Sequence, residues 1–399
     1  MNLTESQRTT ASSTVEQWSV YLDELHARIA HRFRRPEVKE RVQRYLTGLL
    51  AEIRRKNGWQ MAQAIGEAQP RSTQRILNGT RWDAEAVRDD LREYVVEHLG
   101  DKDSGVLIVD ETGFLKKGEK SVGVGRLYTG TAGKRENCQI GVFAVYASEK
   151  GSALVDRELY LPHEWADDPE RRAEAGVPEN VRFATKGWLA RVMLRRAFDA
   201  GVPARWVLAD SIYGADSKFR SWLEERDKHY VLGVHKSTRV WHAGRHYQVK
   251  TLAKGLPQTC WSRISAGSGS KGERLYDWAC LKLQDELADT TGARRWLLLR
   301  RDIEEPEEQT FYLAFAPAGT TPDDLARTAG KRWKIEETFE QAKGEAGLDE
   351  YEVRKWDGWY RHVTLSLLAH AYLSVLRSVA EDEWEAAKKG MQNRIWVPN

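Results

Sequence analysis

Two short runs of apolar residues that each end in an aspartate constrain the fold of this chain most strongly. Residues 105–110 (GVLIVD) and 205–210 (RWVLAD) have the length and apolar character of buried strands, with the acid at the carboxyl end. Residues 186–200 have the apolar spacing of a helix, so we expect the second strand to run parallel to the first after a crossover. Two such strands place Asp110 and Asp210 at one edge of a sheet.

A third candidate acid lies in residues 331–343 (KRWKIEETFEQAK), whose spacing predicts a helix. The apolar residues share one side of this helix and should pack on the sheet; they are Ile335, Phe339, Ala342 and Ala346. A neighbouring strip holds Arg332, Glu336 and Lys343, with Glu340 at its margin. The pattern therefore leaves the third acid open between Glu336 and Glu340.

Three carboxylates in these contexts indicate two-metal chemistry on phosphodiesters. Oxygen ligands suit Mg²⁺ and Mn²⁺, and two such ions activate a nucleophile and stabilise the leaving oxygen. Asp110 is the best candidate for a bridging ligand, because it ends the apolar first strand. A single Asp at a strand end more often begins a turn, and an acid between cations on a helix is often a surface salt bridge. The prediction therefore rests on the set of three acids.

Composition restricts the class of protein less strongly. The chain has 399 residues, enough for two or three domains, and its 62 basic and 59 acidic residues nearly balance, so global charge does not predict nucleic-acid binding. Three cysteines without CxxC spacing speak against a disulfide framework or a zinc ribbon. We find neither an apolar signal core at the amino terminus nor a run of about 18 apolar residues. We therefore expect a cytoplasmic protein without membrane contact.

Changes of pattern along the chain indicate five segments. Residues 1–100 are predicted to form an N-terminal helical DNA-binding domain, 101–236 the first part of a catalytic core, and 237–300 a β-rich insertion. Residues 301–378 form the second part of the core with the Glu-bearing helix, and 379–399 a C-terminal tail. The strands that follow the first acid form a meander, which matches the start of an RNase H-like sheet. The predicted fold class is α/β, an RNase H-like mixed sheet flanked by helices.

The predicted N-terminal domain has a basic face. Apolar residues between 42 and 53 recur with the spacing of an amphipathic helix, whose other face carries arginines and lysines. Residues 60–65 and 70–77 resemble a helix-turn-helix arrangement. Candidate DNA contacts are Arg54, Arg55, Arg75 and Arg81. A small helical bundle with a solvated basic face would explain the same pattern.

Taken in order, the motifs resemble those of insertion-sequence transposases of the DDE type, which have an RNase H-like catalytic fold. The matching motifs are VDETGFLKKG at 109–118, SVGV at 121–124, GTAG at 130–133, NCQIGVF at 137–143, LYLP at 159–162, ADSIYG at 209–214 and RWKIEE at 332–337, with Lys343, Gly347, Leu348, Tyr351, Arg361 and His362. The match extends from about residue 35 to about residue 378.

This resemblance implies cut-and-paste DNA transposition with two Mg²⁺ ions, for which Mn²⁺ can substitute. It assigns the catalytic, metal-binding triad to Asp110, Asp210 and Glu336. It also implies that Arg332 and Lys343 contact phosphates beside the scissile bond. The expected partners are the transposon ends and target DNA, both double-stranded. The resemblance further implies a dimer on paired ends, a hairpin intermediate, and a nucleoid-associated location.

One position departs from the family, and one role is left with several candidates. The family signature Tyr-x-x-Arg-x-x-x-Glu has Ala329 at its Tyr position, so a contact made by that ring is absent or supplied elsewhere. In similar transposases the β-rich insertion stacks a Trp on a flipped base. Trp241, Trp261 and Trp278 are the candidates here, although each also suits a hydrophobic core.

Three alternative functions explain part of the same pattern. An RNase H-like nuclease without strand transfer shares the triad, but it needs no basic helical segment for end recognition. A domesticated DNA-binding derivative does not need an intact triad. A glycosidase with paired carboxylates would not need Arg332 and Lys343 beside the third acid, because these cations favour phosphate over sugar.

Overall fold

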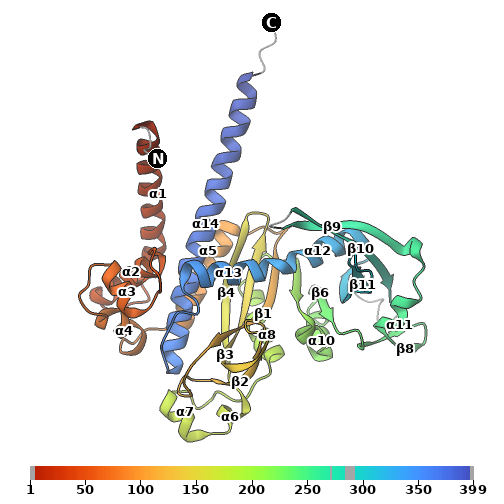
Figure 1. Cartoon of the computed structure of the whole chain (residues 1–399), viewed down its shortest axis with the longest axis horizontal. Helices are drawn as coiled ribbons and strands as arrows, with labels where there is room; N and C mark the ends of the chain where they lie inside the picture. Colours follow the sequence, from red (N-terminus) through yellow and green to blue (C-terminus); the bar gives the residue numbers. More distant parts are fainter. Residues whose placement is uncertain (1–4, 270–271, 284–292, 396–399) are drawn as a thin grey trace.

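A computed structural model of the chain describes residues 5–269, 272–283 and 293–395. Four pieces of the predicted segments lie outside these described residues: 1–4 of the N-terminal domain, 270–271 and 284–292 of the β-rich insertion, and 396–399 of the tail. Figure 1 shows helices gathered at the amino-terminal end, a central sheet, and strands at the opposite end.

The first 100 residues are helical in the part that the structure describes, as the periodicity predicted. The helices are α1 (Glu5–Ala30), α2 (Pro36–Leu50), α3 (Gly58–Ala64), α4 (Arg71–Asn78) and α5 (Ala84–Leu99). Asn57 caps the amino end of α3 and Asp83 that of α5, and each side chain accepts two backbone N–H groups of the first turn. The buried face of α2 includes Val42, Tyr45, Leu46 and Leu49, which lie in the core as predicted.

The central sheet has the strand order of an RNase H-like fold. Its strands are β1 (Val106–Leu115), β3 (Lys134–Ser148), β4 (Gly151–Tyr160), β5 (Trp206–Ala209) and β6 (His229–Val234), with β2 (Gly125–Thr129) beside the first part of β3. In space the order is β4-β3-β1-β5-β6. The first three strands are antiparallel, and β5 and β6 run parallel to β1. The predicted fold class is therefore confirmed.

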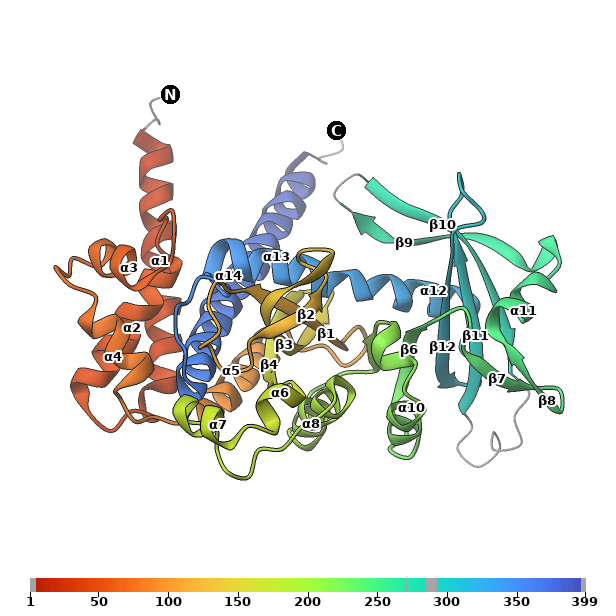
Figure 2. The same cartoon turned by 60° about the horizontal axis from the view of Figure 1, so that its bottom comes forward.

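The sheet continues into the region predicted as a β-rich insertion. Strand β12 (Gln309–Pro317) pairs with β6 and is followed outward by β11 (Ala293–Arg301), β10 (Gly272–Lys282) and β9 (Trp261–Gly269). A separate pair is formed by β7 (Arg239–His242) and β8 (Arg245–Gln248), next to α11 (Val249–Lys254) and a 3₁₀ turn at Gln258–Cys260. Figure 2 shows these strands at the end of the molecule opposite the N-terminal helices.

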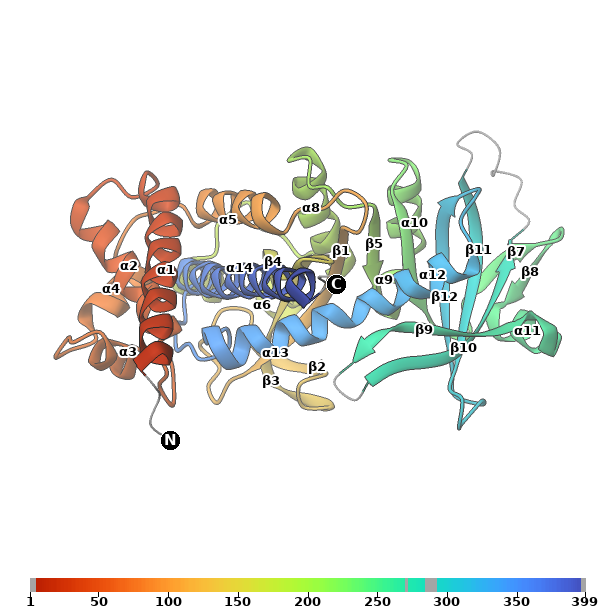
Figure 3. The same ribbon diagram turned by 90° about the horizontal axis from the view of Figure 1, so that it is seen from above.

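Helices cover the central sheet and support the strand ends. Between β4 and β5 lie α6 (His163–Ala166), α7 (Pro169–Ala175) and α8 (Lys186–Asp199), and after β5 lie α9 (Ser211–Gly214) and α10 (Ser217–Glu224). The chain after β12 forms α12 (Pro322–Gly330), a 3₁₀ turn at Lys331–Trp333, α13 (Lys334–Ala346) and α14 (Trp356–Ile395). Viewed from above, α12 and α13 follow one another along the sheet (Figure 3).

Helix α14 differs from the prediction in two respects: it contains a long apolar segment, and it extends past the predicted start of the tail. Its part Trp356–Trp384 is long and apolar enough to cross a membrane by length and composition, which the sequence analysis missed. However, 72% of its most apolar window is buried inside the protein, so we regard this part as a core helix. The helix also continues without a break past residue 378, where the tail was predicted to begin.

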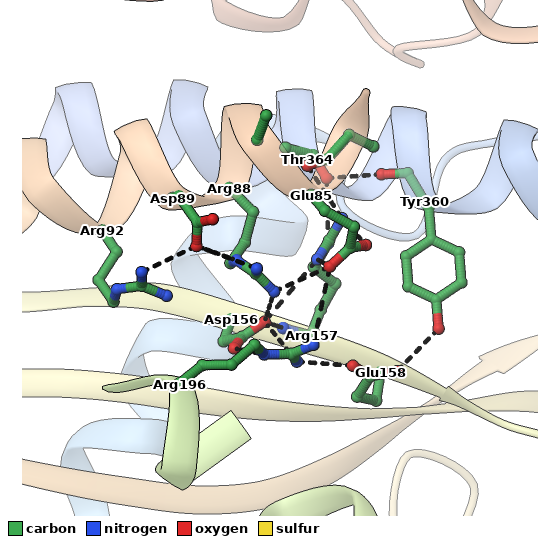
Figure 4. A network of polar contacts seen from close by, with 12 residues as sticks. Glu85, Arg88, Asp89, Arg92, Asp156, Arg157, Glu158, Arg196, Tyr360 and Thr364 are labelled. Carbon is green, nitrogen blue, oxygen red and sulfur yellow. Dashed lines mark hydrogen bonds and ion pairs between the residues drawn. The ribbon is translucent and has the colours of Figure 1, made fainter. Parts of the chain in front are cut away.

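A buried network of charges joins α5 to the sheet. The side chains of Asp156 and Arg157 on β4 are 2% and 0% exposed. Asp156 accepts from Arg88 of α5 and Arg196 of α8, and Arg157 donates to Thr364 of α14 (Figure 4). Such a network holds its elements in one arrangement, because loss of one partner leaves a charge buried without compensation.

Candidate active site

Asp110 and Asp210 lie beside each other on neighbouring parallel strands. The pairing of β1 with β5 ends at Val109 and Ala209, and each aspartate is the next residue in the chain. Asp210 follows the end of β5, as predicted, but β1 does not end at Asp110 as predicted, because its pairing with β3 continues to Leu115. Asp210 caps the amino end of α9, and its Oδ1 accepts the backbone N–H of Ile212 at 2.8 Å. The crossover topology therefore brings together two acids that are 100 residues apart in sequence, as predicted.

The electrostatics of this pair favour a bound cation. Burial raises the pKa of Asp110 to about 7, and the nearby charges of Asp210 and Glu111 add to the shift. Burial also raises the pKa of Asp210, with Glu111 as the next cause. When two carboxylates with raised pKa values are both ionised, burial and mutual repulsion make their charged forms unfavourable in free energy. A divalent cation between them would offset this unfavourable free energy.

Helix α13 and the turn before it bring the third acid and two cations to the same strand. Arg332 donates from Nη2 to Oε1 of Glu336 at 2.7 Å, and its Nη1 lies 3.4 Å from Oδ2 of Asp110. Lys343 donates from Nζ to Oγ1 of Thr112 at 2.8 Å, two residues beyond Asp110 on β1. Glu340 is exposed on α13. Of the two acids that the pattern left open, Glu336 is therefore the one linked to Asp110.

The donor set suits a hard divalent cation, although an arginine separates two of its members. Among the residues that the structure describes, no three acidic, His or Cys side chains are grouped as a ready metal site. Arg332 lies between Asp110 and Glu336 and balances their charge. Asp110 and Asp210 nevertheless fit Mg²⁺ or Mn²⁺, because both offer carboxylate oxygens and both carry raised pKa values.

The opposite face of β1 carries a cluster that the sequence analysis did not identify. Glu111 accepts from Nζ of Lys186 at 2.6 Å and from the hydroxyl of Tyr213 at 2.7 Å. Strand alternation places Glu111 on the face of β1 opposite to that of Asp110. The partners were missed because Lys186 and Tyr213 are 75 and 102 residues away in sequence. Tyr213 lies in the motif ADSIYG at 209–214, whereas Lys186 begins the predicted helix of residues 186–200 and lies in none of the motifs.

A cavity of about 500 Å³ opens beside Asp210, between the core and the β-rich insertion. Of the three tryptophans predicted to stack on a base, the structure places Trp278 in its lining. The ring of Trp278 is 2% exposed and stacks on Tyr312 at 6.0 Å, so it is mainly a core residue. Trp333 lines the same cavity and is 46% exposed, but the sequence analysis did not select it.

The other two candidate tryptophans lie elsewhere. Trp241 is on β7, in the separate two-stranded sheet, with its ring 5.0 Å from that of His246. Trp261 begins β9, and the guanidinium of Arg301 lies 4.2 Å above its ring. The structure therefore brings neither ring into the cavity lining beside Asp210.

The four arginines predicted to contact DNA are exposed on the N-terminal helical part. Arg54 and Arg55 lie in the loop between α2 and α3, Arg75 is on α4, and Arg81 precedes α5. Arg55 lines a groove of about 590 Å³ that also includes Lys117 from the loop after β1. This groove lies between the N-terminal helices and the strand that carries Asp110.

Comparison with known proteins gives two matching family models and one curated relative. The model described as DDE superfamily endonuclease matches residues 24–265, and the model described as transposase DDE domain matches residues 184–372. A probable transposase for insertion sequence element IS701 from Microchaete diplosiphon is 25% identical over 311 residues, which cover 77% of this chain and 74% of the relative.

Among solved structures, the NurA nuclease from Sulfolobus solfataricus aligns over 79% of this chain and 94% of its own, at 10% identity and a TM-score of 0.26. That agreement is too low to support a conclusion about function.

Proposed function

The chain belongs to the DDE superfamily endonucleases, and from this we propose that it is the transposase of an insertion-sequence element. One observation supports the proposal most strongly. Asp110 and Asp210 lie side by side where the pairing of the parallel strands β1 and β5 of an RNase H-like sheet ends, and Arg332 joins Asp110 to Glu336. Hydrolysis at the element ends and attack of the freed 3′-hydroxyl on target DNA would both take place at these acids.

Asp110, Asp210 and Glu336 would hold two Mg²⁺ ions, or Mn²⁺ in their place. Bound ions would activate the attacking oxygen and stabilise the leaving oxygen. The protein's own groups would fix the DNA around them. Arg332 would contact a non-bridging phosphate oxygen, because its planar guanidinium suits phosphate as well as carboxylate. Lys343, held at Thr112, would contact a second phosphate further along β1.

The N-terminal helices would bind the element end at a part of the DNA distant from the scissile bond. Arg54, Arg55, Arg75 and Arg81 are exposed, and Arg55 lies at a groove that leads towards β1. Trp333 lines the cavity at Asp210 and is 46% exposed, so an unstacked base next to the cut would fit against its ring, whereas the buried Trp278 would support the cavity wall. Joining two ends requires two copies of the chain, so we propose a dimer on paired ends, acting on nucleoid DNA in the cytoplasm.

The test is cleavage of a DNA that carries the flanking sequences of the protein's own gene, in Mg²⁺, by the wild type and Asp110→Ala. We expect cleavage at the element ends that the variant loses, followed by joining to a target plasmid. Cleavage unrelated to the ends would indicate a plain nuclease instead. Binding to the ends without cleavage would indicate a regulatory derivative.

A further inference from the structure

The two aspartates lie where their strands separate. Pairing between β1 and β5 runs from Val106 and Trp206 to Val109 and Ala209 and stops there. Beyond that point β1 continues along β3, while the chain after Asp210 turns into α9. No ladder between β1 and β5 therefore holds the acids together, and their like charges repel each other when both are ionised.

A side-chain link spans this separation on the opposite face of β1. Glu111 follows Asp110 directly, and Tyr213 is three residues after Asp210. The Tyr213 hydroxyl donates to Oε2 of Glu111 at 2.7 Å, and Lys186 donates to Oε1 at 2.6 Å. Both oxygens of Glu111 are thus engaged within the protein, and the side chain of Tyr213 is fully buried. Glu111 is accordingly poorly placed to act as a ligand itself.

Helix α9 is also fixed on its other side. A Cβ atom added to Gly214 would lie 1.9 Å from the carbonyl oxygen of Gly233 on β6, so only glycine allows this close approach. Contact with β6 at Gly214 and the bond to β1 through Tyr213 together hold α9 between the two strands. Because Asp210 caps α9 through the N–H of Ile212, a shift of α9 moves the Asp210 carboxylate.

We propose that the Tyr213–Glu111 hydrogen bond, with Lys186 neutralising Glu111, fixes the separation of the Asp110 and Asp210 carboxylates. Glu111 and Tyr213 are then positioning residues for a divalent cation. This inference rests on the proposed function in one respect, since it takes Asp110 and Asp210 as the cation-binding pair. A role in stability alone is the competing explanation, and it predicts no effect on cation affinity.

The chain offers a matched control for the loss of this hydroxyl. Tyr230 on β6 is 2% exposed and donates to Glu224 at 2.6 Å. Glu224 in turn accepts from Nε of Arg295 at 3.0 Å. Tyr230→Phe therefore deletes an equivalent buried hydrogen bond from a tyrosine to a glutamate. As at Glu111, a basic side chain also donates to that glutamate, but this cluster lies away from the two aspartates. The melting temperatures of Tyr213→Phe and Tyr230→Phe should fall by similar, small amounts.

The decisive measurement is Mn²⁺ binding to the DNA-free protein, followed by the electron paramagnetic resonance signal of free Mn²⁺. We expect Tyr213→Phe to weaken binding by about 10-fold or more, as loss of a partner behind a ligand commonly does, and Tyr230→Phe to bind as the wild type. In cleavage assays Tyr213→Phe should need more Mg²⁺ for half-maximal rate, with the KM for DNA unchanged.

Two results would overturn the inference: equal Mn²⁺ affinity in all three proteins, or equal loss in both tyrosine variants. Asp110→Ala, measured in parallel, tests the premise, because unchanged Mn²⁺ binding there would show that the aspartates do not hold the cation and would remove the inference with it. Weaker Mn²⁺ binding by Tyr213→Phe, in a protein whose wild type leaves element ends uncut, would support the inference while rejecting the transposase function.

Discussion

The guanidinium of Arg332 donates a hydrogen bond to Oε1 of Glu336 at 2.7 Å, one helical turn away. Its second terminal nitrogen lies 3.4 Å from Asp110, so the arginine joins the helix acid to the strand acid in the DNA-free protein. A phosphate would compete with these carboxylates for the arginine, and a divalent cation would compete with the arginine for the carboxylates. The arrangement therefore suits a site that changes its contacts when substrate binds.

The proposal that Glu336, and not Glu337 or Glu340, is the third acid of the site can be tested with three variants of α13. We expect Glu336→Gln to lower the rate of end cleavage by more than the roughly 10–100-fold that follows loss of a partner behind a ligand, because Glu336 is itself the proposed ligand. Glu337→Gln and Glu340→Gln should retain the wild-type rate. Glu337 makes a surface pair with Lys334 at 2.9 Å, so it controls for the loss of a charge at the adjacent position. Full activity of Glu336→Gln would contradict the assignment.

The exposed arginines of the N-terminal part should contribute to DNA binding by contacting phosphates rather than bases. We predict that Arg55→Ala combined with Arg75→Ala weakens binding to element ends and unrelated DNA alike. The slope of log affinity against log salt should fall by about 1 for each lost contact. Fluorescence anisotropy over a range of salt concentrations measures this slope. Arg327→Ala is the control, because Arg327 is exposed on α12 and pairs with Asp323; a slope that stays at the wild-type value in the double variant would refute the assignment.

The buried network on β4 predicts a large loss of stability when one charge is removed. Asp156→Asn leaves Arg88 and Arg196 without their shared partner, so the free energy of unfolding should fall by about 3–5 kcal/mol (Figure 4). Chemical denaturation measures the difference. Asp323→Asn removes an exposed partner of Arg327 and should cost at most about 1 kcal/mol. Similar small losses in the two variants would mean that the network is not a structural tie between α5 and the sheet.

His362 predicts a specific dependence of stability on pH. Burial lowers its pKa from 6.5 to about 4, and the neutral ring bonds to the Tyr45 hydroxyl at 2.8 Å and the Gly347 carbonyl at 3.0 Å. The unfolded chain therefore binds a proton between pH 6.5 and pH 4 that the folded chain does not. Stability should be complete above pH 6.5 and fall as pH drops through this window, by about 3 kcal/mol.

His362→Gln separates this contribution from other buried groups. The variant should be less stable at pH 7, but its stability should fall less steeply between pH 6.5 and pH 4 than that of the wild type. Urea denaturation at several pH values gives both quantities. Identical pH profiles for the two proteins would show that His362 is not the group responsible. Tyr45 is on α2, so loss of this bond would also loosen the N-terminal helices from α14.

Local patterns were sufficient for several parts of this protein. The apolar runs that end in Asp110 and Asp210 predicted two buried strands, and the crossover helix predicted that they run parallel. Both features appear in β1 and β5. These predictions succeeded because strand and helix periodicity and the handedness of crossovers are properties of neighbouring residues. The same patterns left the third acid open between Glu336 and Glu340, since both lie near one helix strip.

Only the tertiary structure decided which side chains meet. Contact with Arg332, and through it with Asp110, distinguishes Glu336 from Glu340, and this depends on where α13 crosses the sheet. The Glu111, Lys186 and Tyr213 cluster joins three elements that no sequence spacing relates. Burial likewise placed Trp278 in the core and left Trp333 exposed at the same cavity. Sequence determined which chemical groups lie at strand and helix ends, whereas packing between distant elements determined their partners, because contact energy depends on distance in space.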